Sequence, residues 1–207
     1  MSEPIRILAV DDHPLFREGI AALISGQPDM KLVAEASNGS EAIALTREHR
    51  PDIILMDLQM AQMNGLDATM SICREFPDTK IIVLTTYSGD AQVLRALKAG
   101  ARAYLLKNLV AKELLETIRA VHAGKRTLSP EVSYQLAEHA TNDPLTPAEL
   151  AVLRQIAAGS ANKEIAGQLS ISEESVKGRV RSILSKLGAK DRTDAAIIAI
   201  RRGIIEL

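Results

Sequence analysis

The sequence contains few aromatic residues and a single cysteine. Aromatic residues make up 2% of the 207 residues, and there is no tryptophan. Proteins that bind single-stranded nucleic acids stack bases on aromatic side chains, so this composition argues against that class. The lone Cys73 excludes an internal disulfide and a cysteine-based zinc site. We therefore expect an aliphatic core and a reducing, cytoplasmic environment.

The sequence also lacks long hydrophobic runs. No apolar stretch approaches the ~20 residues that a membrane-spanning helix needs, and residues 1–6 do not have the pattern of a signal peptide. Neither secretion nor membrane insertion is therefore expected. The 46% hydrophobic and 25% charged residues are typical of a globular protein, and the length favours two small domains.

Five short aliphatic runs alternate with segments of helical periodicity in the first part of the sequence. They cover residues 5–10, 31–36, 53–56, 80–84 and 103–106. Consecutive apolar residues in runs of this length are typical of strands buried on both faces, and hence of a parallel sheet. The sequence therefore predicts a five-stranded, three-layer α/β domain over residues 1–124.

The rest of the sequence has helical patterns only. We interpret residues 125–144 as a linker with a short helix over residues 130–140, because glycine, proline and asparagine bound a weak apolar pattern. A capping box at Thr146 begins the first of four further helices. The second and third, over residues 162–169 and 173–187, are separated by a three-residue turn. This spacing predicts a small all-α helix-turn-helix domain.

Five polar residues follow or end four of the predicted strands. Asp11 and Asp12 follow the first strand, Asp57 the third and Lys107 the fifth, while Thr85 ends the fourth. The carboxyl ends of parallel strands lie at one edge of a sheet, so we expect these side chains to converge there. Neighbouring carboxylates repel one another unless a cation neutralises them, and oxygen ligands favour Mg2+. The sequence therefore predicts an acidic magnesium site.

The spacing of these residues resembles the receiver domain of two-component response regulators. Asp57 follows Asp11 by 46 residues, Thr85 follows Asp57 by 28, and Lys107 follows Thr85 by 22. The resemblance implies a doubly wound, flavodoxin-like sheet with strand order 2-1-3-4-5. It also implies that Asp57 is the phosphoacceptor and receives a phosphoryl group from a sensor histidine kinase.

The resemblance further implies that Mg2+ is bound by four groups, namely Asp11, Asp12, Asp57 and the backbone carbonyl of Gln59. Receivers often carry proline and aspartate where this sequence has Ala61 and Asn64. Without proline to fix φ, Ala61 loosens the loop after Asp57, whereas Asn64-Gly65 retains turn-forming residues. We therefore expect the site to persist. We expect His13, next to the acidic pair, to begin a helix rather than to bind the metal.

By the same resemblance, Lys107 and Thr85 would contact the phosphoryl group, because a cation and a hydroxyl donor both stabilise the charge on its oxygens. In receivers, movement of the threonine lets an aromatic residue on the fifth strand turn inward. That residue is Tyr104 here, so a switch from Thr85 to Tyr104 is implied. Taken alone, Tyr104 is typical of a half-buried strand residue.

The helix predicted over residues 173–187 has an apolar side and a basic side. Its apolar residues recur at helical spacing and are expected in the core; they are Val176, Val180, Ile183, Leu184 and Leu187. Residues 176–190 include five basic residues and no acidic one, whereas a solvated surface usually mixes both signs. This pattern favours contact with nucleic-acid phosphates. The outward face is expected to contain Gly178, Arg181, Ser182 and Ser185.

Residues 145–207 resemble the LuxR-type DNA-binding domain through the segments LTPAE (145–149), NKEIA (162–166) and SVK (175–177). With the receiver pattern, the chain is similar to the NarL/FixJ family of transcription regulators. The resemblance implies that Lys177, Gly178 and Arg181 face base edges of double-stranded DNA, while Arg179 and Lys163 contact phosphates. Gly178 removes a side chain from this face, which leaves the target sequence open.

The last predicted helix, over residues 193–202, has more isoleucines than a small domain needs for its core. Ile197, Ile200 and Ile204 recur at helical spacing, and Ile198 and Ile205 widen the stripe. Part of the stripe is expected to pack on the other helices, and the remainder predicts a dimer contact. The resemblance implies a homodimer that forms on phosphorylation and binds paired half-sites.

Two other classes of protein share part of this pattern. Phosphatases of the haloacid dehalogenase type also use a strand-end aspartate with Mg2+, but Gln59 stands where their second aspartate acts as the general acid. LuxR relatives controlled by a small ligand need an apolar pocket in their first domain. Such a pocket would not require Asp57 and Lys107 to converge. The sequence therefore predicts a transcription regulator and not an enzyme.

Overall fold

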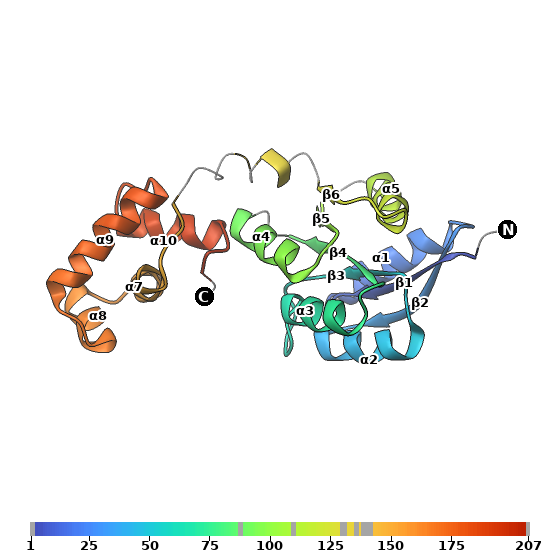
Figure 1. Ribbon diagram of the computed structural model, residues 1–207, viewed down its shortest axis with the longest axis horizontal. Helices are drawn as coiled ribbons and strands as arrows, with labels where there is room; N and C mark the ends of the chain where they lie inside the picture. Colours follow the sequence, from blue (N-terminus) through green and yellow to red (C-terminus); the bar gives the residue numbers. More distant parts are fainter. Residues whose placement is uncertain are drawn as a thin grey trace. The chain divides into compact units, whose positions relative to one another are not determined.

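Two compact units make up the chain (Figure 1). The computed structural model describes residues 3–86, 89–108, 111–128, 132–134, 137 and 143–205. Of the described residues, the first unit contains 3–86, 93–128 and 132–133, and the second contains 89–92, 134, 137 and 143–205. The first is an α/β unit and the second is helical, which confirms the predicted fold classes.

Strands and helices alternate along residues 3–128. In chain order they are β1 (Ile5–Val10), α1 (Pro14–Ser25), β2 (Met30–Ala36), α2 (Gly39–His49), β3 (Ile53–Met56), α3 (Gly65–Glu75), β4 (Lys80–Thr85), α4 (Asp90–Ala99), β5 (Ala103–Leu106), α5 (Ala111–His122) and β6 (Thr127–Leu128). The strands form one parallel sheet in the order β2-β1-β3-β4-β5-β6. The doubly wound order implied for the first five strands is confirmed.

Strand β6 is one strand more than the five that the sequence predicted. It lies within residues 125–144, for which the sequence predicts a linker. Two residues have no periodicity, so the extended conformation of β6 comes from pairing with β5, next to which Thr127 N donates to Arg102 O at 3.1 Å. The helix predicted over residues 130–140 lies mostly outside the described residues.

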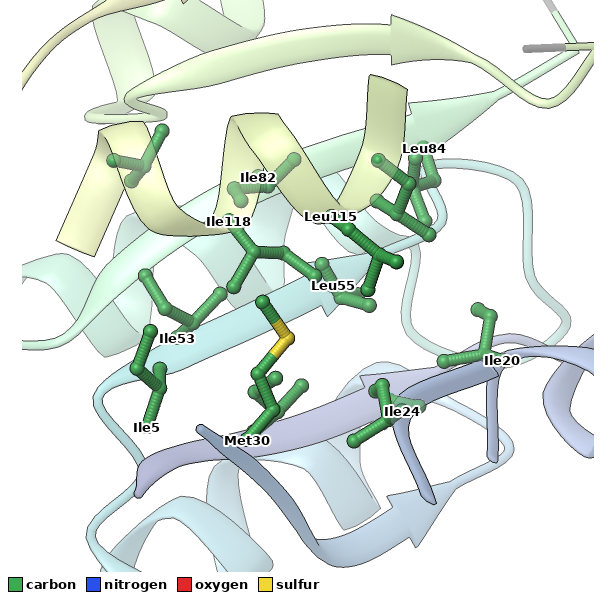
Figure 2. Close-up of a cluster of buried hydrophobic side chains, with 14 of the residues drawn as sticks. Ile5, Ile20, Ile24, Met30, Ile53, Leu55, Ile82, Leu84, Leu115 and Ile118 are labelled. Carbon is green, nitrogen blue, oxygen red and sulfur yellow. The ribbon is translucent and has the colours of Figure 1, made fainter. Parts of the chain in front are cut away.

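Helices cover both faces of the sheet, which explains the consecutive apolar residues of its strands. Ile7 of β1 belongs to the core formed with α1 and α5, whereas its neighbour Leu8 belongs to the core formed with α2 and α3. Figure 2 shows the first of these cores, in which Ile24 of α1, Leu55 of β3 and Ile118 of α5 are buried. The two cores hold the strands rigidly, so the residues at the strand ends have fixed positions.

Residues 143–205 of the second unit form four helices. They are α7 (Pro147–Ala157), α8 (Asn162–Leu169), α9 (Glu173–Leu187) and α10 (Arg192–Arg201). The predicted capping box is present, because Glu149 N donates to Thr146 Oγ1 at 3.3 Å and Thr146 N donates to Glu149 Oε2 at 2.7 Å. Between α8 and α9, Ser170 is left-handed and Ser172 caps α9. The predicted helix-turn-helix is therefore confirmed.

The isoleucine stripe predicted at the last helix divides as expected, because part of it packs on the core and part is exposed. Ile205 is 3% exposed, Ile200 and Ile204 pack partly buried against the core, and Ile197 is 49% exposed. The helix α10 also buries Ala195, Ala196 and Ala199. Small side chains let packed helices approach more closely, so the alanine face is the one that faces the core. None of the described helices is long and apolar enough to cross a membrane.

Gly65 is required where α3 begins close to the end of β3. Its backbone N donates to Leu58 O at 3.1 Å, and a Cβ at this position would collide with the backbone oxygen of Asp57. We predict that Gly65→Ala lowers the free energy of unfolding of the first unit by ~1–3 kcal/mol in urea denaturation. Gly19→Ala is the control, because a Cβ there meets no atom within 4 Å. Equal stability of the two variants would contradict the close approach.

Candidate functional site

Hydrogen bonds just beyond the strands fix the residues at the carboxyl edge of the sheet. Asp57 N, one residue after β3, donates to Val10 O of β1 at 2.9 Å. Lys107 N, one residue after β5, donates to Thr85 O of β4 at 2.8 Å. These bonds hold the two side chains at the same edge, so the predicted convergence is present in the structure.

The ammonium group of Lys107 lies between two carboxylates. Its Nζ is 2.8 Å from Asp57 Oδ2 and 2.7 Å from Asp11 Oδ2. The Lys107 side chain is 11% exposed, and the two aspartate side chains are almost completely buried. The same Nζ lies 4.8 Å from the centroid of the Phe16 ring. The result is a cation held in a site that is nearly closed to water.

Burial and charge act in opposite directions on the ionisation of this cluster. Burial raises the pKa of the Asp57 carboxyl, and the charge of Asp11 adds to the rise, against the opposing effect of Lys107. Burial would lower the pKa of Lys107, but hydrogen bonds to Asp11 and Asp57 raise it overall. Lys107 therefore stays cationic, while ionised Asp57 gains from a second cation nearby.

The acidic site has the composition of a divalent-cation site. Asp11, Asp12, His13 and Asp57 each offer one ligand atom, and these atoms lie within 4.8 Å of one another. Asp11 Oδ2 and Asp12 Oδ1 are buried oxygen atoms, and their nearest side-chain nitrogens are Lys107 Nζ at 2.7 Å and His13 Nδ1 at 2.8 Å. Hard oxygen atoms in this arrangement fit Mg2+.

His13 begins α1 as the N-cap residue, where the sequence predicted a helix start. Its backbone N donates to Asp11 Oδ1 at 2.9 Å, and its ring Nδ1 lies 3.2 Å from the same oxygen. Sequence reasoning missed the ring contact, and it also missed Phe16. An aromatic residue in the first turn of a helix that follows an acidic pair is the signal that would have indicated Phe16.

The loop after Asp57 returns its backbone to the acidic site. Gln59 N donates to Asp57 Oδ1 at 3.3 Å. Asn64 caps α3 by accepting a hydrogen bond from Asp67 N at 2.9 Å, so the expected turn-forming role of Asn64 is present. Gln62 has a left-handed backbone with φ 68°. The loop is therefore anchored at both ends around Ala61, without the proline common in receivers.

Thr85 and Tyr104 are both fully buried on adjacent strands. Tyr104 is therefore not the half-buried strand residue that its sequence alone indicates. Burial raises the pKa of the Tyr104 phenol, and the charge of Asp57 raises it further. The phenol is thus close enough to the acidic site to respond to its charge.

Helix α9 presents most of the predicted residues to solvent. Lys177, Gly178 and Arg181 are exposed, Arg179 is partly exposed, and Lys163 is exposed on α8. On the opposite side of α9 the core contains two fully buried residues, Val176 and Ile183. The amphipathic division of α9 is therefore as predicted. Lys177 also lies 3.6 Å from a Glu173 carboxylate oxygen.

Ser182, which was predicted to face outward, and Lys186, one of the five basic residues of 176–190, both contact a buried carboxylate of α7. Ser182 Oγ donates to Glu149 Oε1 at 2.6 Å, and Lys186 Nζ donates to Glu149 Oε2 at 2.9 Å and to Pro144 O at 3.1 Å. A buried carboxylate is costly without donors, so it draws these two side chains inward. Lys186 is neutralised there and does not join the exposed basic residues.

The Glu149 cluster fixes α9 against the start of α7. Burial would raise the pKa of Glu149, but hydrogen bonds from Ser182, Thr146 and Lys186 lower it to about 2. The capping box indicated Glu149 as a helix-start residue, but the sequence gave no signal for its contact with α9. Glu149 and its partners on α9, Ser182 and Lys186, lie far apart in the chain.

Comparisons with known proteins cover both units. Residues 7–119 match the family described as response regulator receiver domain, and residues 143–199 match bacterial regulatory proteins of the luxR family. The chain is 44% identical over 209 residues to the transcriptional regulatory protein LiaR of Bacillus subtilis, covering 97% of this chain and 99% of LiaR. It is 39% identical over 207 residues to the response regulator VraR of Staphylococcus aureus, covering 98% and 99%.

A solved structure of two RcsB dimers bound to two parallel DNAs is also similar. The TM-score is 0.75 at 25% identity, and the similarity covers 96% of this chain and 99% of that one. The likeness therefore extends over both units and not only over the acidic site.

Glu149 generates a prediction for the pH dependence of the second unit. Its pKa is about 2 in the folded unit, below its ordinary 4.5. The ionised Glu149 carboxylate therefore contributes on the order of 3 kcal/mol to the stability of the folded unit. This contribution is complete above pH 4.5 and is lost as the pH falls toward 2. We predict that α9 amides lose hydrogen-exchange protection over this range, and that Glu149→Gln removes this pH dependence.

The control for this experiment is Glu174→Gln, because Glu174 lies on α9, whose amides are measured, and its side chain is exposed. It should leave the pH dependence unchanged. Protection of α9 that is constant from pH 5 to pH 2 in the unaltered chain would contradict the role of Glu149.

Proposed function

Because the chain belongs to the NarL/LuxR family of two-component response regulators, we propose that Asp57 accepts a phosphoryl group from a sensor histidine kinase and that this modification controls dimerisation and DNA binding. Members of this family regulate transcription and are not enzymes. The observation that carries the proposal is the buried Lys107 ammonium 2.8 Å from Asp57 Oδ2. We assign residues 1–124 to the receiver, 125–144 to the linker and 145–207 to the DNA-binding domain.

Asp57 is the nucleophile in the proposed transfer. One of its carboxylate oxygens forms a bond to phosphorus, while the bond from phosphorus to the donor's leaving group breaks and the leaving group keeps the electron pair. Lys107 stabilises negative charge on the phosphoryl oxygens, and the Thr85 hydroxyl donates a hydrogen bond to one of them. The buried position of Lys107 supports this role, because charge interactions are stronger where water is excluded.

Mg2+ would be held by Asp11, Asp12, Asp57 and the backbone carbonyl of Gln59. When bound, it neutralises the carboxylates and the incoming phosphoryl oxygens. Two observations support this ligand set: Asp11 and Asp12 each have a buried carboxylate oxygen, and the carboxylates lie close together.

The signal would leave the receiver through Thr85 and Tyr104. Once Thr85 donates to a phosphoryl oxygen, its altered position changes the packing around Tyr104 on the adjacent strand. The full burial of both side chains supports this coupling, because a movement in a close-packed core displaces its neighbours. A switch of this kind is what joins a local phosphorylation to a distant domain.

In the DNA-binding domain, α9 would enter the major groove as the recognition helix. Lys177, Gly178 and Arg181 would face base edges, while Arg179 and Lys163 would contact phosphates. Their exposure supports these roles, and so does the similarity to RcsB, whose dimers have been solved bound to DNA. The exposed Ile197 on α10 supports a dimer contact, which would place two α9 helices on paired half-sites.

Phosphoryl transfer to Asp57 is tested with acetyl phosphate and Mg2+. We predict a mass gain of one phosphoryl group, and no gain in Asp57→Asn, because an amide is a poor nucleophile. Asp78→Asn, an exposed aspartate away from the acidic site, should behave as the unaltered chain. A chelator should abolish the gain, and a mass gain that persists in Asp57→Asn would place the modification elsewhere.

DNA recognition is tested by comparing two arginines of α9. We predict that Arg181→Ala costs ~1–3 kcal/mol of binding to a specific duplex and relaxes preference at one base position. Arg179→Ala should weaken all duplexes alike and lower the salt slope by roughly 1. Arg154→Ala on α7 is the control. Equal losses on specific and random duplexes for Arg181→Ala would show that it does not contact a base.

A further inference from the structure

The Lys107 ammonium also contacts Phe16, a residue with no role in the phosphoryl transfer described above. Its Nζ lies over the ring of Phe16, 4.8 Å from the centroid. A cation over an aromatic face is attracted by the ring's quadrupole, and the attraction increases where water is excluded. Lys107 is 11% exposed, so the contact lies in such an environment.

Phe16 is held in this place by the start of α1. Its backbone N donates to His13 O at 3.1 Å, and the Arg17 side chain donates to Asp11 O at 2.5 Å. The preceding Leu15 is 81% exposed, whereas Phe16 packs partly buried against the aliphatic core. The first turn of α1 therefore aims an aromatic face at the acidic edge of the sheet.

We propose that Phe16 is a positioning residue for phosphoryl transfer, because its ring holds the Lys107 ammonium where the phosphoryl oxygens arrive. This inference rests on the proposed function of Asp57. Lys107 makes the contact with the phosphoryl group, and Phe16 acts through Lys107.

The reaction weakens the other two partners of Lys107. When Asp57 forms its bond to phosphorus, the bonding oxygen loses most of its negative charge. A bound Mg2+ would also share the Asp11 carboxylate. The Phe16 ring undergoes no change of charge, proton or bond. Its share in holding the ammonium therefore grows as the transfer proceeds.

The experiment replaces Phe16 site-specifically by 4-fluoro-, 3,5-difluoro- and pentafluorophenylalanine in the full chain. These side chains keep the ring's shape while the negative potential of its face decreases in steps. The readout is the initial rate of phosphoryl gain from acetyl phosphate at saturating Mg2+. We expect the rate to fall in the same steps, by about two- to thirtyfold over the series. Phe16→Leu should resemble the pentafluoro variant, and Phe16→Tyr should retain most of the rate.

The matched control is the same series at Phe76, whose ring lies 4.5 Å from the Arg50 guanidinium and away from the strand ends that hold Asp57. It should leave the rate unchanged. In NMR, the methylene protons next to Lys107 Nζ should lose a ring-current shift in Phe16→Leu.

The possible results separate this inference from the proposed function. A stepwise loss at Phe16 with none at Phe76 supports the positioning role. Normal phosphoryl gain in the unaltered chain, with equal rates across the Phe16 series, would overturn the role of Phe16 alone. No phosphoryl gain in the unaltered chain would overturn both.

Discussion

The hydrogen bonds from the Lys107 ammonium to Asp11 and Asp57 are the interaction on which the acidic site depends. A parallel sheet brings its strand ends to one edge, and here those ends carry carboxylates that repel one another. Lys107 Nζ, 2.7 Å and 2.8 Å from the two carboxylates, offsets part of this repulsion. The negative charge that remains is of the kind that a divalent cation neutralises.

The second unit also depends on a buried carboxylate, but this carboxylate positions a helix and takes part in no reaction. Glu149 joins the capped start of α7 to Ser182 and Lys186 of α9, and it is satisfied by donors on every side. The exposed face of α9 is therefore presented from a fixed helix. In the first unit the carboxylates remain available to a ligand, whereas in the second unit the Glu149 carboxylate already accepts hydrogen bonds from its neighbours.

The sequence was sufficient to predict the features that depend on local pattern. The strand ends at Asp57 and Lys107 could be located because aliphatic runs and the residues after them are adjacent in the chain. The bounds of α8 and α9 followed from caps and apolar spacing. These predictions required only that neighbouring residues share one element.

Features that depend on residues far apart in the chain could not be predicted. Strand β6 takes its conformation from β5, and Ser182 turns inward because Glu149 lies opposite it. The alanines that α10 buries beside part of its isoleucine stripe were selected by the closeness of the packed helices. Phe16 acquired its contact with Lys107 only when α1 and β5 met. Each of these outcomes is a tertiary contact with no counterpart in local periodicity.

We propose that phosphorylation of Asp57 controls DNA binding by the second unit. The most direct test is the affinity of the full chain for a duplex selected from a random library, measured with and without the phosphoryl group. From the couplings usual in conformational switches, we expect phosphorylation to tighten DNA binding by about 5- to 150-fold. Thr85→Ala should reduce this factor, although Asp57 should still accept phosphate. Equal affinity in the two states, at protein concentrations below the dimerisation constant, would contradict the claim.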